Sequence, residues 1–240
     1  MYGQALLTNV KCFRGHNGIL FKIPDGEVEN VTVTLRQMKN MLLSGAASVT
    51  AARDELTDID SRFGDADHGI TMEKIMKVLG RAVDDCGEDG TIRGLMNAVS
   101  MAVMTINGGS AVPLWTTLFD GLAEGAPDRA DMSEDEFRAM FRCGYETLFE
   151  ISKAKKGDKT MMDALEPAVD ALGATTGCLA DMMKAAARAA EAGAGETVNF
   201  AARFGRAKNY GERSIGTPDA GAMSMKYFIQ GLSEGLDRDQ

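Results

Sequence analysis

The stretch LTDIDSRFGDADHGITM, residues 56–72, is the part of the chain around which we organise the rest. Four aspartates fall within ten residues of it, Asp58, Asp60, Asp65 and Asp67, and a helical pattern follows directly. Carboxylates this close repel one another, so a fold that keeps them together needs a cation between them, and hard oxygen ligands suit Mg²⁺. Asp67 is also placed to cap the next helix, whose free N–H groups would face a phosphate. The stretch therefore has two readings, a Mg²⁺–phosphate site or a polar loop that caps a helix.

The composition is that of a globular protein rich in helices. Of 240 residues, 45% are hydrophobic, 25% are charged and 6% are aromatic, which is ordinary for a globular protein. A chain of this length can form a sizeable buried core. The formal net charge is −9, and no basic block occurs, so we expect no nucleic-acid partner. An acidic protein that handles phosphates needs metal ions to offset the charge, which agrees with the aspartate-rich stretch.

The cysteines and the apolar runs bear on where the protein works. Four cysteines are scattered without a CxxC pair: Cys12, Cys86, Cys143 and Cys178. We interpret them as reduced thiols of a cytoplasmic protein. With only two histidines, a histidine-rich zinc site is excluded. The start of the chain does not resemble a signal peptide, and no run of eighteen apolar residues predicts a membrane span.

Apolar residues recur at steps of three and four from Leu35 to Ile59, and similar stripes follow, so the sequence predicts an all-α antiparallel bundle of eight helices without a confident strand. The expected helices cover about residues 34–60, 69–85, 91–105, 113–123, 133–153, 161–172, 175–192 and 219–236. Ser133 and Glu136 form a capping-box pattern. Methionines on the stripes are interpreted as core residues.

We expect residues 33–240 to form the domain and residues 1–32, with a short strand at 19–23, to form an arm-like extension.

Alternate loops of an antiparallel bundle lie at the same end, so the loops after the first, third, fifth and seventh helices should meet. These are the aspartate-rich loop and residues 107–110, 156–160 and 205–216. Gly108 and Gly109 would let backbone N–H groups approach a phosphate, and Ser110 adds a hydroxyl. Each loop also has a plainer reading, as a turn, a helix cap or a solvated loop. Asp219 is expected to cap the last helix.

Three motifs together resemble a known family. Gly64-Asp65-Ala66-Asp67-His68-Gly69, Gly157-Asp158-Lys159-Thr160-Met161 and Gly211-Glu212-Arg213-Ser214-Ile215-Gly216 are similar to the L, nucleotide-binding, subunit of dihydroxyacetone kinase. The resemblance extends over residues 33–237. It implies an eight-helix antiparallel barrel with ADP or ATP bound at one rim.

The resemblance also implies roles for particular residues. Two Mg²⁺ ions would be held by Asp60, Asp65 and Asp67. The nucleotide would contact His68, Gly69, Ile70, Thr71, Gly109, Ser110, Met161, Arg206, Asp219, Ala220 and Gly221. No side chain would act covalently, because phosphoryl transfer of this kind depends on metals and oriented donors.

The activity implied is that of a kinase subunit. Its bound nucleotide would pass a phosphoryl group to a ketose on a separate K subunit, and a phosphohistidine-carrying M subunit would recharge the nucleotide in the phosphotransferase-system type, which we favour slightly. An ATP-dependent kinase subunit for erythrulose or another short ketose is an alternative, as is a non-catalytic nucleotide-sensing regulatory protein. A fatty acid kinase is disfavoured by the length of the chain, and a homodimer is a further candidate assembly.

The chain departs from the family pattern at three places. Residues 108–113 read Gly-Gly-Ser-Ala-Val-Pro where the family usually has Gly-Gly-x-Ser-Gly-Pro. Ser152 stands where a glycine is common, and Ala220 replaces the usual proline. The altered glycine loop is the feature that favours the regulatory alternative.

Overall fold

The computed structural model describes residues 32–236, and the predicted strand at 19–23 and Cys12 lie outside them. The described residues form α1 (Leu35–Ala51), α2 (Arg53–Ser61), α3 (His68–Asp85), α4 (Ile92–Met104), α5 (Ala111–Gly125), α6 (Glu134–Ser152), α7 (Met162–Ala174), α8 (Leu179–Glu196) and α9 (Ala220–Leu236). Two short strands, β1 (Thr32–Thr34) and β2 (Asp131–Ser133), and 3₁₀ turns at Thr197–Asn199, Ala207–Asn209 and Gly211–Ser214 complete them.

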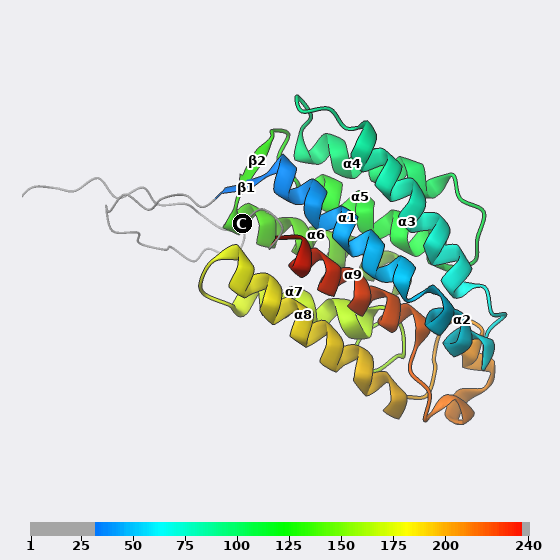
Figure 1. The fold of residues 1–240 in the computed structure, drawn as a ribbon. Helices are drawn as coiled ribbons and strands as arrows, with labels where there is room; N and C mark the ends of the chain where they lie inside the picture. Colours follow the sequence, from blue (N-terminus) through cyan, green and yellow to red (C-terminus); the bar gives the residue numbers. More distant parts are fainter. Residues whose placement is uncertain (1–31, 237–240) are drawn as a thin grey trace, which may run out of the picture. The chain divides into compact units, whose positions relative to one another are not determined.

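Eight of these helices form a closed ring. Neighbours in the chain pack side by side from α3 to α9, α1 packs against α3, and α9 returns to pack against α1 (Figure 1). The short helix α2 extends α1 towards one end of the ring and packs mainly on α3. The predicted all-α antiparallel barrel of eight helices is therefore confirmed.

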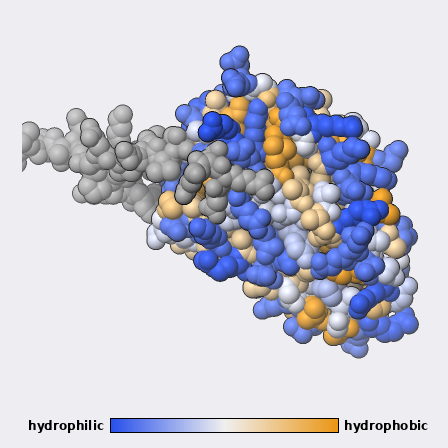
Figure 2. Space-filling model, viewed as in Figure 1, coloured by the Kyte–Doolittle hydropathy of each residue, from blue (hydrophilic) through white to orange (hydrophobic). Residues whose placement is uncertain are grey.

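The apolar stripes of the helices fill the interior of the ring. On α3, for example, Met72, Ile75 and Leu79 are fully buried. Many of the largest buried side chains are methionines, as the sequence predicted, and unbranched methionine suits the narrow space inside a ring of helices. The outer surface is mostly hydrophilic in the view of Figure 2. None of the helices within residues 32–236 is long and apolar enough to cross a membrane.

The first predicted helix is wrong in one respect, because it is broken in two. Ala52 takes φ −87° and ψ 6°, so α1 ends there and α2 starts at Arg53. Gly69 of α3 lies against the backbone of α2: a Cβ on Gly69 would lie 2.0 Å from the Arg53 carbonyl oxygen. The short helix α2 therefore packs closely on the start of α3.

The structure also contains two short strands that the sequence did not indicate. Strands β1 and β2 pair antiparallel, with Val33 opposite Met132, and both of these side chains are fully buried. The pairing is only three residues long, which is too short for an alternating pattern to be visible in the sequence. It holds the start of α1 beside the start of α6, and the capping box of Ser133 and Glu136 is present there as predicted.

Both boundaries of one helix differ by more than the fraying expected at helix ends. The seventh predicted helix was expected over residues 175–192, but α8 begins at Leu179 and ends at Glu196. Gly177 takes φ +129°, a conformation that residues with a side chain rarely adopt. The chain around Gly177 is therefore a loop, and α8 begins only after it.

Candidate functional site

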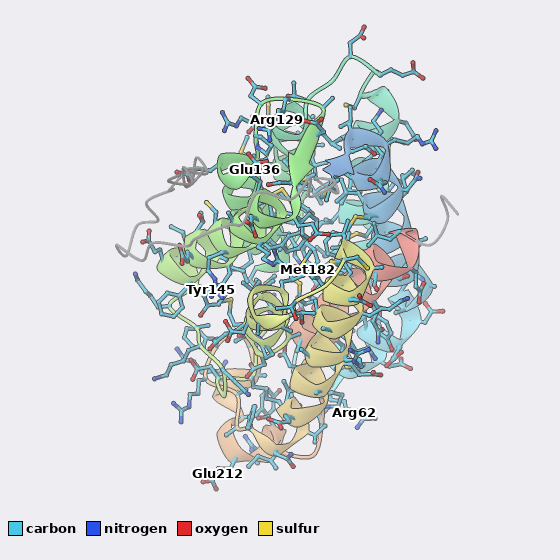
Figure 3. All side chains as sticks on the ribbon, turned by 90° about the vertical axis from the view of Figure 1, so that its left-hand side faces the viewer. Arg62, Arg129, Glu136, Tyr145, Met182 and Glu212 are labelled. Carbon is cyan, nitrogen blue, oxygen red and sulfur yellow. The ribbon has the colours of Figure 1, made fainter. Side chains whose placement is uncertain are left out.

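Four segments between helices meet at one end of the barrel around a cavity of about 470 Å³. They are the Asp loop, defined here as residues 62–67, the loop after α4, the loop after α6 and the segment between α8 and α9. Figure 3 shows Arg62 of the Asp loop and Glu212 of the last segment at one end, opposite Arg129 and Glu136. The predicted meeting of these four loops is therefore confirmed.

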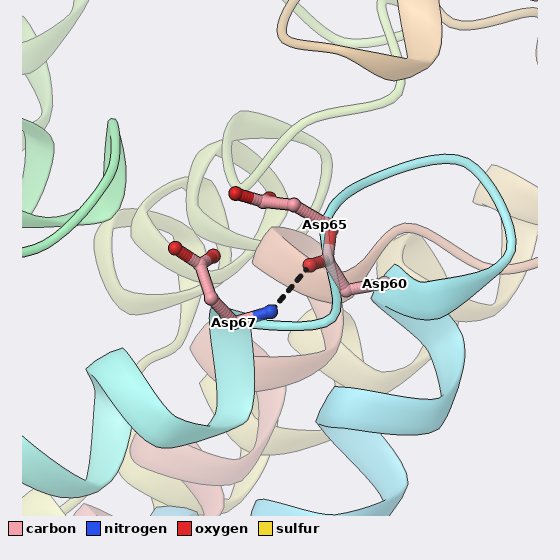
Figure 4. Close-up of side chains that lie close together, drawn as sticks. All are labelled: Asp60, Asp65 and Asp67. Carbon is pink, nitrogen blue, oxygen red and sulfur yellow. Dashed lines mark hydrogen bonds between the residues drawn. The ribbon is translucent and has the colours of Figure 1, made fainter.

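The carboxylates of Asp60, Asp65 and Asp67 lie together on the wall of this cavity (Figure 4). One oxygen from each lies within 4.8 Å of the others. The N–H groups of Asp67 and His68, at the start of α3, donate to Asp60 Oδ2 over 3.1 and 3.4 Å. Asp67 occupies the N-cap position of α3, but its side chain accepts no capping hydrogen bond. Asp60 therefore does the capping that the sequence assigned to Asp67, and the carboxylate of Asp67 is left to face the cavity.

The backbone of the Asp loop is shaped to keep the three carboxylates together. A Cβ on Gly64 would lie 2.0 Å from Asp60 Oδ1, so only glycine fits there. Ala66 takes φ +60°, a left-handed conformation that costs a non-glycine residue free energy. Strain at this position is typical of a loop whose geometry serves a site.

The electrostatics of the cluster fit a bound cation. The pKa of Asp67 is raised, first by burial and then by the neighbouring charges of Asp65 and Asp60, and Arg206 opposes this shift. Arg206 Nη2 lies 2.7 Å from Asp65 Oδ2 and supplies part of the missing positive charge. Three carboxylates facing one cavity are a hard oxygen donor set, which suits Mg²⁺. The residues present therefore fit a divalent metal.

His68 lies in the first turn of α3 and lines the same cavity. Its Nε2 atom lies 3.2 Å from Ser224 Oγ of α9. Burial lowers the pKa of His68 below its ordinary value, against the opposing effect of Asp60. The ring is therefore neutral at pH 7, and it joins α3 to α9 while it presents one edge to the cavity.

The glycine loop after α4 lies next to the carboxylates. A Cβ on Gly109 would lie 3.8 Å from Asp67 Oδ2, so its backbone runs close to the cluster, and Ser110 is exposed at the cavity. Val112, where the family usually has glycine, is buried in the core. Trp115 is 1% exposed and packs on Phe119 and Phe228, so it is a packing residue.

Sequence reasoning did not single out the buried polar network on the far wall of the cavity. Lys159 takes φ +62° and is only 4% exposed, and its Nζ donates to the carbonyl oxygens of Thr197 and Thr217. Asp163 is fully buried and accepts hydrogen bonds from the N–H groups of Gly157 and Thr160, at 2.5 and 2.7 Å. The network fixes the loop after α6 to the segment that leads into α9.

Charges in this network are strongly perturbed. Burial raises the pKa of Asp219 to about 7, although Lys159 and the N–H group of Ala222 favour its ionised form. Ala222 N–H donates to Asp219 Oδ2 over 2.8 Å, so Asp219 caps α9 as predicted. Burial also lowers the pKa of Lys159, and Asp219 and Asp163 oppose the change.

The structure brings together most of the residues that the sequence proposed for the site. Twelve of them line the cavity: Asp60, Asp65, Asp67, His68, Thr71, Gly109, Ser110, Met161, Arg206, Asp219, Ala220 and Gly221. Gly69 and Ile70 do not. Gly69 packs against α2, and Ile70 is 37% exposed. Lys159 lines the cavity too, and its occurrence in a Gly-Asp-Lys-Thr turn was the signal that could have indicated it.

The described residues thus form a helical barrel with a carboxylate cluster among four converging loops. The model of the DAK2 domain family matches residues 62–234, so the chain belongs to this family. It is 31% identical to the Escherichia coli protein "PEP-dependent dihydroxyacetone kinase, ADP-binding subunit DhaL", over 85% of this chain and 98% of that protein.

Longer relatives contain the same region as a part. The chain is 32% identical to the L-erythrulose kinase of Pectobacterium atrosepticum, matching 81% of this chain and 35% of that protein. It is 31% identical to dihydroxyacetone kinase 1 of Saccharomyces cerevisiae, over 80% and 33%. The fold is also that of the dihydroxyacetone kinase from C. freundii, solved with AMP-PNP and Mg²⁺, with a TM-score of 0.66 and 20% identity over 96% of this chain and 38% of that one.

Proposed function

We propose that this chain is the ADP- or ATP-binding subunit of a dihydroxyacetone (glycerone) kinase. The observation that carries the proposal is the carboxylate cluster of Asp60, Asp65 and Asp67 in the cavity where four loops converge. It stands in a chain that matches 98% of an ADP-binding subunit named for this activity. The phosphotransferase-system type is favoured because that relative is named PEP-dependent.

In this proposal the three aspartates hold Mg²⁺, two ions in all. Bound Mg²⁺ neutralises the charge of the nucleotide phosphates during phosphoryl transfer. The glycine loop at Gly109 and Ser110 offers N–H and hydroxyl donors to the phosphates, and Arg206 adds a guanidinium. His68 to Thr71 begin the helix whose N-terminus faces them. Met161 and residues 219–221 form the opposite wall against the nucleotide.

The rest of the assembly follows from this assignment. The phosphoryl acceptor is a ketose held on a separate K-type subunit, and an M-type phosphocarrier recharges the nucleotide. We propose that this subunit is cytoplasmic and forms a homodimer. In this proposal residues 33–240 are the nucleotide-binding domain, and the expected N-terminal extension lies outside the described residues except for Thr32.

A second acceptor is favoured by specific relatives. Two erythrulose kinases of Mycolicibacterium smegmatis are each 33% identical to this chain, which corresponds to about a third of their length. An ATP-dependent subunit for erythrulose is therefore the alternative. Purified protein that retains ADP would favour the phosphotransferase-system type, whereas protein that binds ATP only on addition would favour the alternative.

The proposal is tested with native mass spectrometry and calorimetry of the full chain, with ADP and ATP, with and without Mg²⁺. Asp65→Asn and Asp67→Asn should abolish Mg²⁺-dependent nucleotide binding while the circular dichroism spectrum stays helical. Asp58→Asn is the matched control, because Asp58 lies on α2 outside the cluster and is exposed. Unchanged nucleotide affinity in the first two variants would reject the site assignment. If the wild-type protein binds neither ADP nor ATP, both the kinase assignment and the nucleotide-sensing regulatory alternative would be rejected.

A further inference from the structure

Arg206 and Asp65 join two segments that are far apart in the chain. Arg206 Nη2 lies 2.7 Å from Asp65 Oδ2. Asp65 is one of the three clustered carboxylates, so the guanidinium is paired with a side chain that the proposed function assigns to the metal. The two side chains are 67% and 33% exposed, so the pair can separate without opening the core.

The segment that carries Arg206 is anchored on both sides of this residue. Three hydrogen bonds donated by backbone N–H groups hold its ends: Arg203 N–H to the Asp158 carbonyl at 3.2 Å, Ala202 N–H to the Ser214 side-chain Oγ at 2.9 Å and Gly216 N–H to the Val198 carbonyl at 2.7 Å. Between these anchors, residues 204–213 reach the Asp loop through the ion pair and through the edge contact of Tyr210 on Phe63, with ring centroids 5.1 Å apart. The middle of the segment can therefore move while its ends stay in place.

Two glycines give the backbone the freedom to do so. Gly205 takes φ +61° and Gly211 takes φ +53°, and a Cβ at either position would meet nothing within 4 Å. Gly205 and Gly211 lie on either side of Arg206, and glycine changes its backbone dihedral angles at a lower free-energy cost than other residues. The guanidinium can therefore be turned from Asp65 towards the cavity, which Arg206 also lines.

From this arrangement we propose that Arg206 competes with the divalent metal for Asp65, and that a nucleotide phosphate removes this competition by binding the guanidinium. The proposal rests on the proposed function of the cavity. Without nucleotide, Asp65 is paired with Arg206 and is less available as a ligand for the metal. With nucleotide bound, the phosphate offers the guanidinium a second anionic partner, so Asp65 becomes available to the metal. Metal binding then depends on the presence of nucleotide.

Thermodynamic linkage makes the consequence measurable. If nucleotide raises the affinity for metal by some factor, metal raises the affinity for nucleotide by the same factor. Removal of Arg206 should raise the affinity for metal alone and lower the affinity for nucleotide. Damage to the site would lower both, so the opposite signs distinguish competition from a loss of structure.

The test compares Arg206→Gln with Lys208→Gln. Both changes remove one positive charge from the same segment, and Lys208 lies outside the proposed machinery and is exposed. The probe is Mn²⁺ alone, titrated into nucleotide-free protein and followed by electron paramagnetic resonance of the free ion, with Mg²⁺ calorimetry as a check. We expect Arg206→Gln to bind Mn²⁺ three- to tenfold more tightly than wild type, and Lys208→Gln to change the affinity less than twofold. The factor by which ADP strengthens Mn²⁺ binding should fall in Arg206→Gln alone.

Hydrogen exchange provides a second readout that needs no metal. Residues 204–213 should exchange faster in Arg206→Gln than in Lys208→Gln, because the ion pair is one of the contacts that hold them. An unchanged or weaker affinity for Mn²⁺ in Arg206→Gln, with the helical spectrum intact, would overturn the proposal. Equal gains in both variants would overturn it as well, because they would show a general charge effect. Failure of the wild type to bind nucleotide would instead reject the proposed function.

Discussion

Gly64 lies so close to Asp60 that a Cβ at this position would be 2.0 Å from Asp60 Oδ1. The Gly64 N–H group also donates to the Asp60 carbonyl over 2.6 Å. The glycine and the aspartate are therefore a single structural unit, in which the absence of a side chain lets the carboxylate turn towards α3 and the cavity.

Gly64→Ala should lower the affinity for Mg²⁺, because the new methyl group must push the Asp60 carboxylate away from its two N–H donors at the start of α3. We expect a loss of at least about tenfold, as is typical when the support of a metal ligand is removed. The measurement is calorimetric titration of Mg²⁺ into the protein in the presence of ADP.

Gly87→Ala is the control for this change, because a Cβ at Gly87 would meet nothing within 4 Å. It should bind as the wild type does. Equal affinity in Gly64→Ala and Gly87→Ala would show that Asp60 does not need its present orientation.

Gly69 was expected to contact the nucleotide, but its surroundings assign it a packing role. A Cβ there would lie 2.0 Å from the Arg53 carbonyl oxygen and 2.3 Å from Thr57 Oγ1. Gly69→Ala should therefore lower the free energy of unfolding by about 2 kcal/mol, since α2 and α3 must move apart. Urea denaturation followed by circular dichroism measures the change.

Gly80→Ala on the same helix gives the comparison. A Cβ at Gly80 lies 3.9 Å from Leu43, an ordinary contact, and alanine favours a helix by up to about 1 kcal/mol relative to glycine. Gly80→Ala should leave the protein as stable or make it more stable. If Gly69→Ala unfolds at the same urea concentration as the wild type, the close packing of α2 on α3 is not important for stability.

The antiparallel bundle and the meeting of the four loops could be predicted, because both follow from periodicity and from the alternation of directions in such a bundle. The closed ring was implied only by the resemblance to the family. The cluster of Asp60, Asp65 and Asp67 was visible because its members are close in the sequence. The break at Ala52 was not predictable, since no glycine or proline marks it. The strands β1 and β2 were too short to show a pattern.

The role of Lys159 was hidden for a different reason. In the sequence it belongs to a polar turn, and nothing local indicates that its ammonium group is buried against carbonyl groups 38 and 58 residues away. Burial of a charged group depends on tertiary contacts, which a motif does not display. The same holds for Asp163, whose helical position hides its bonds to the preceding loop.

Lys159→Met should destabilise the protein, because it leaves the carbonyl groups of Thr197 and Thr217 without their donor and removes the cation beside Asp219. Loss of a buried charged donor costs about 2 to 4 kcal/mol. Chemical denaturation at pH 7 measures the change. Lys156→Met serves as the control, because Lys156 is exposed on the same loop, and it should change stability by less than about 0.5 kcal/mol. Equal effects of the two substitutions would mean that the buried bonds of Lys159 contribute little.

Asp219 should make the stability of the protein depend on pH. Its pKa is about 7 in the folded protein, raised from an ordinary value of 3.8, because burial disfavours the charged form. Between these two values the folded state holds a proton that the unfolded state has released. This contribution to stability is complete below about pH 4 and is lost as the pH rises through about 7, with a slope of at most about 1.4 kcal/mol per pH unit.

Asp219→Asn removes this titration and keeps the helix cap, since asparagine accepts the Ala222 hydrogen bond as aspartate does. Urea denaturation of both proteins at pH 5, 6, 7 and 8 should show the wild type losing stability relative to Asp219→Asn up to about pH 7, after which the difference becomes constant. Groups that do not interact with Asp219 titrate alike in both proteins and cancel in the difference. A difference that stays constant from pH 5 to pH 8 would show that Asp219 titrates at its ordinary value, held ionised by Lys159.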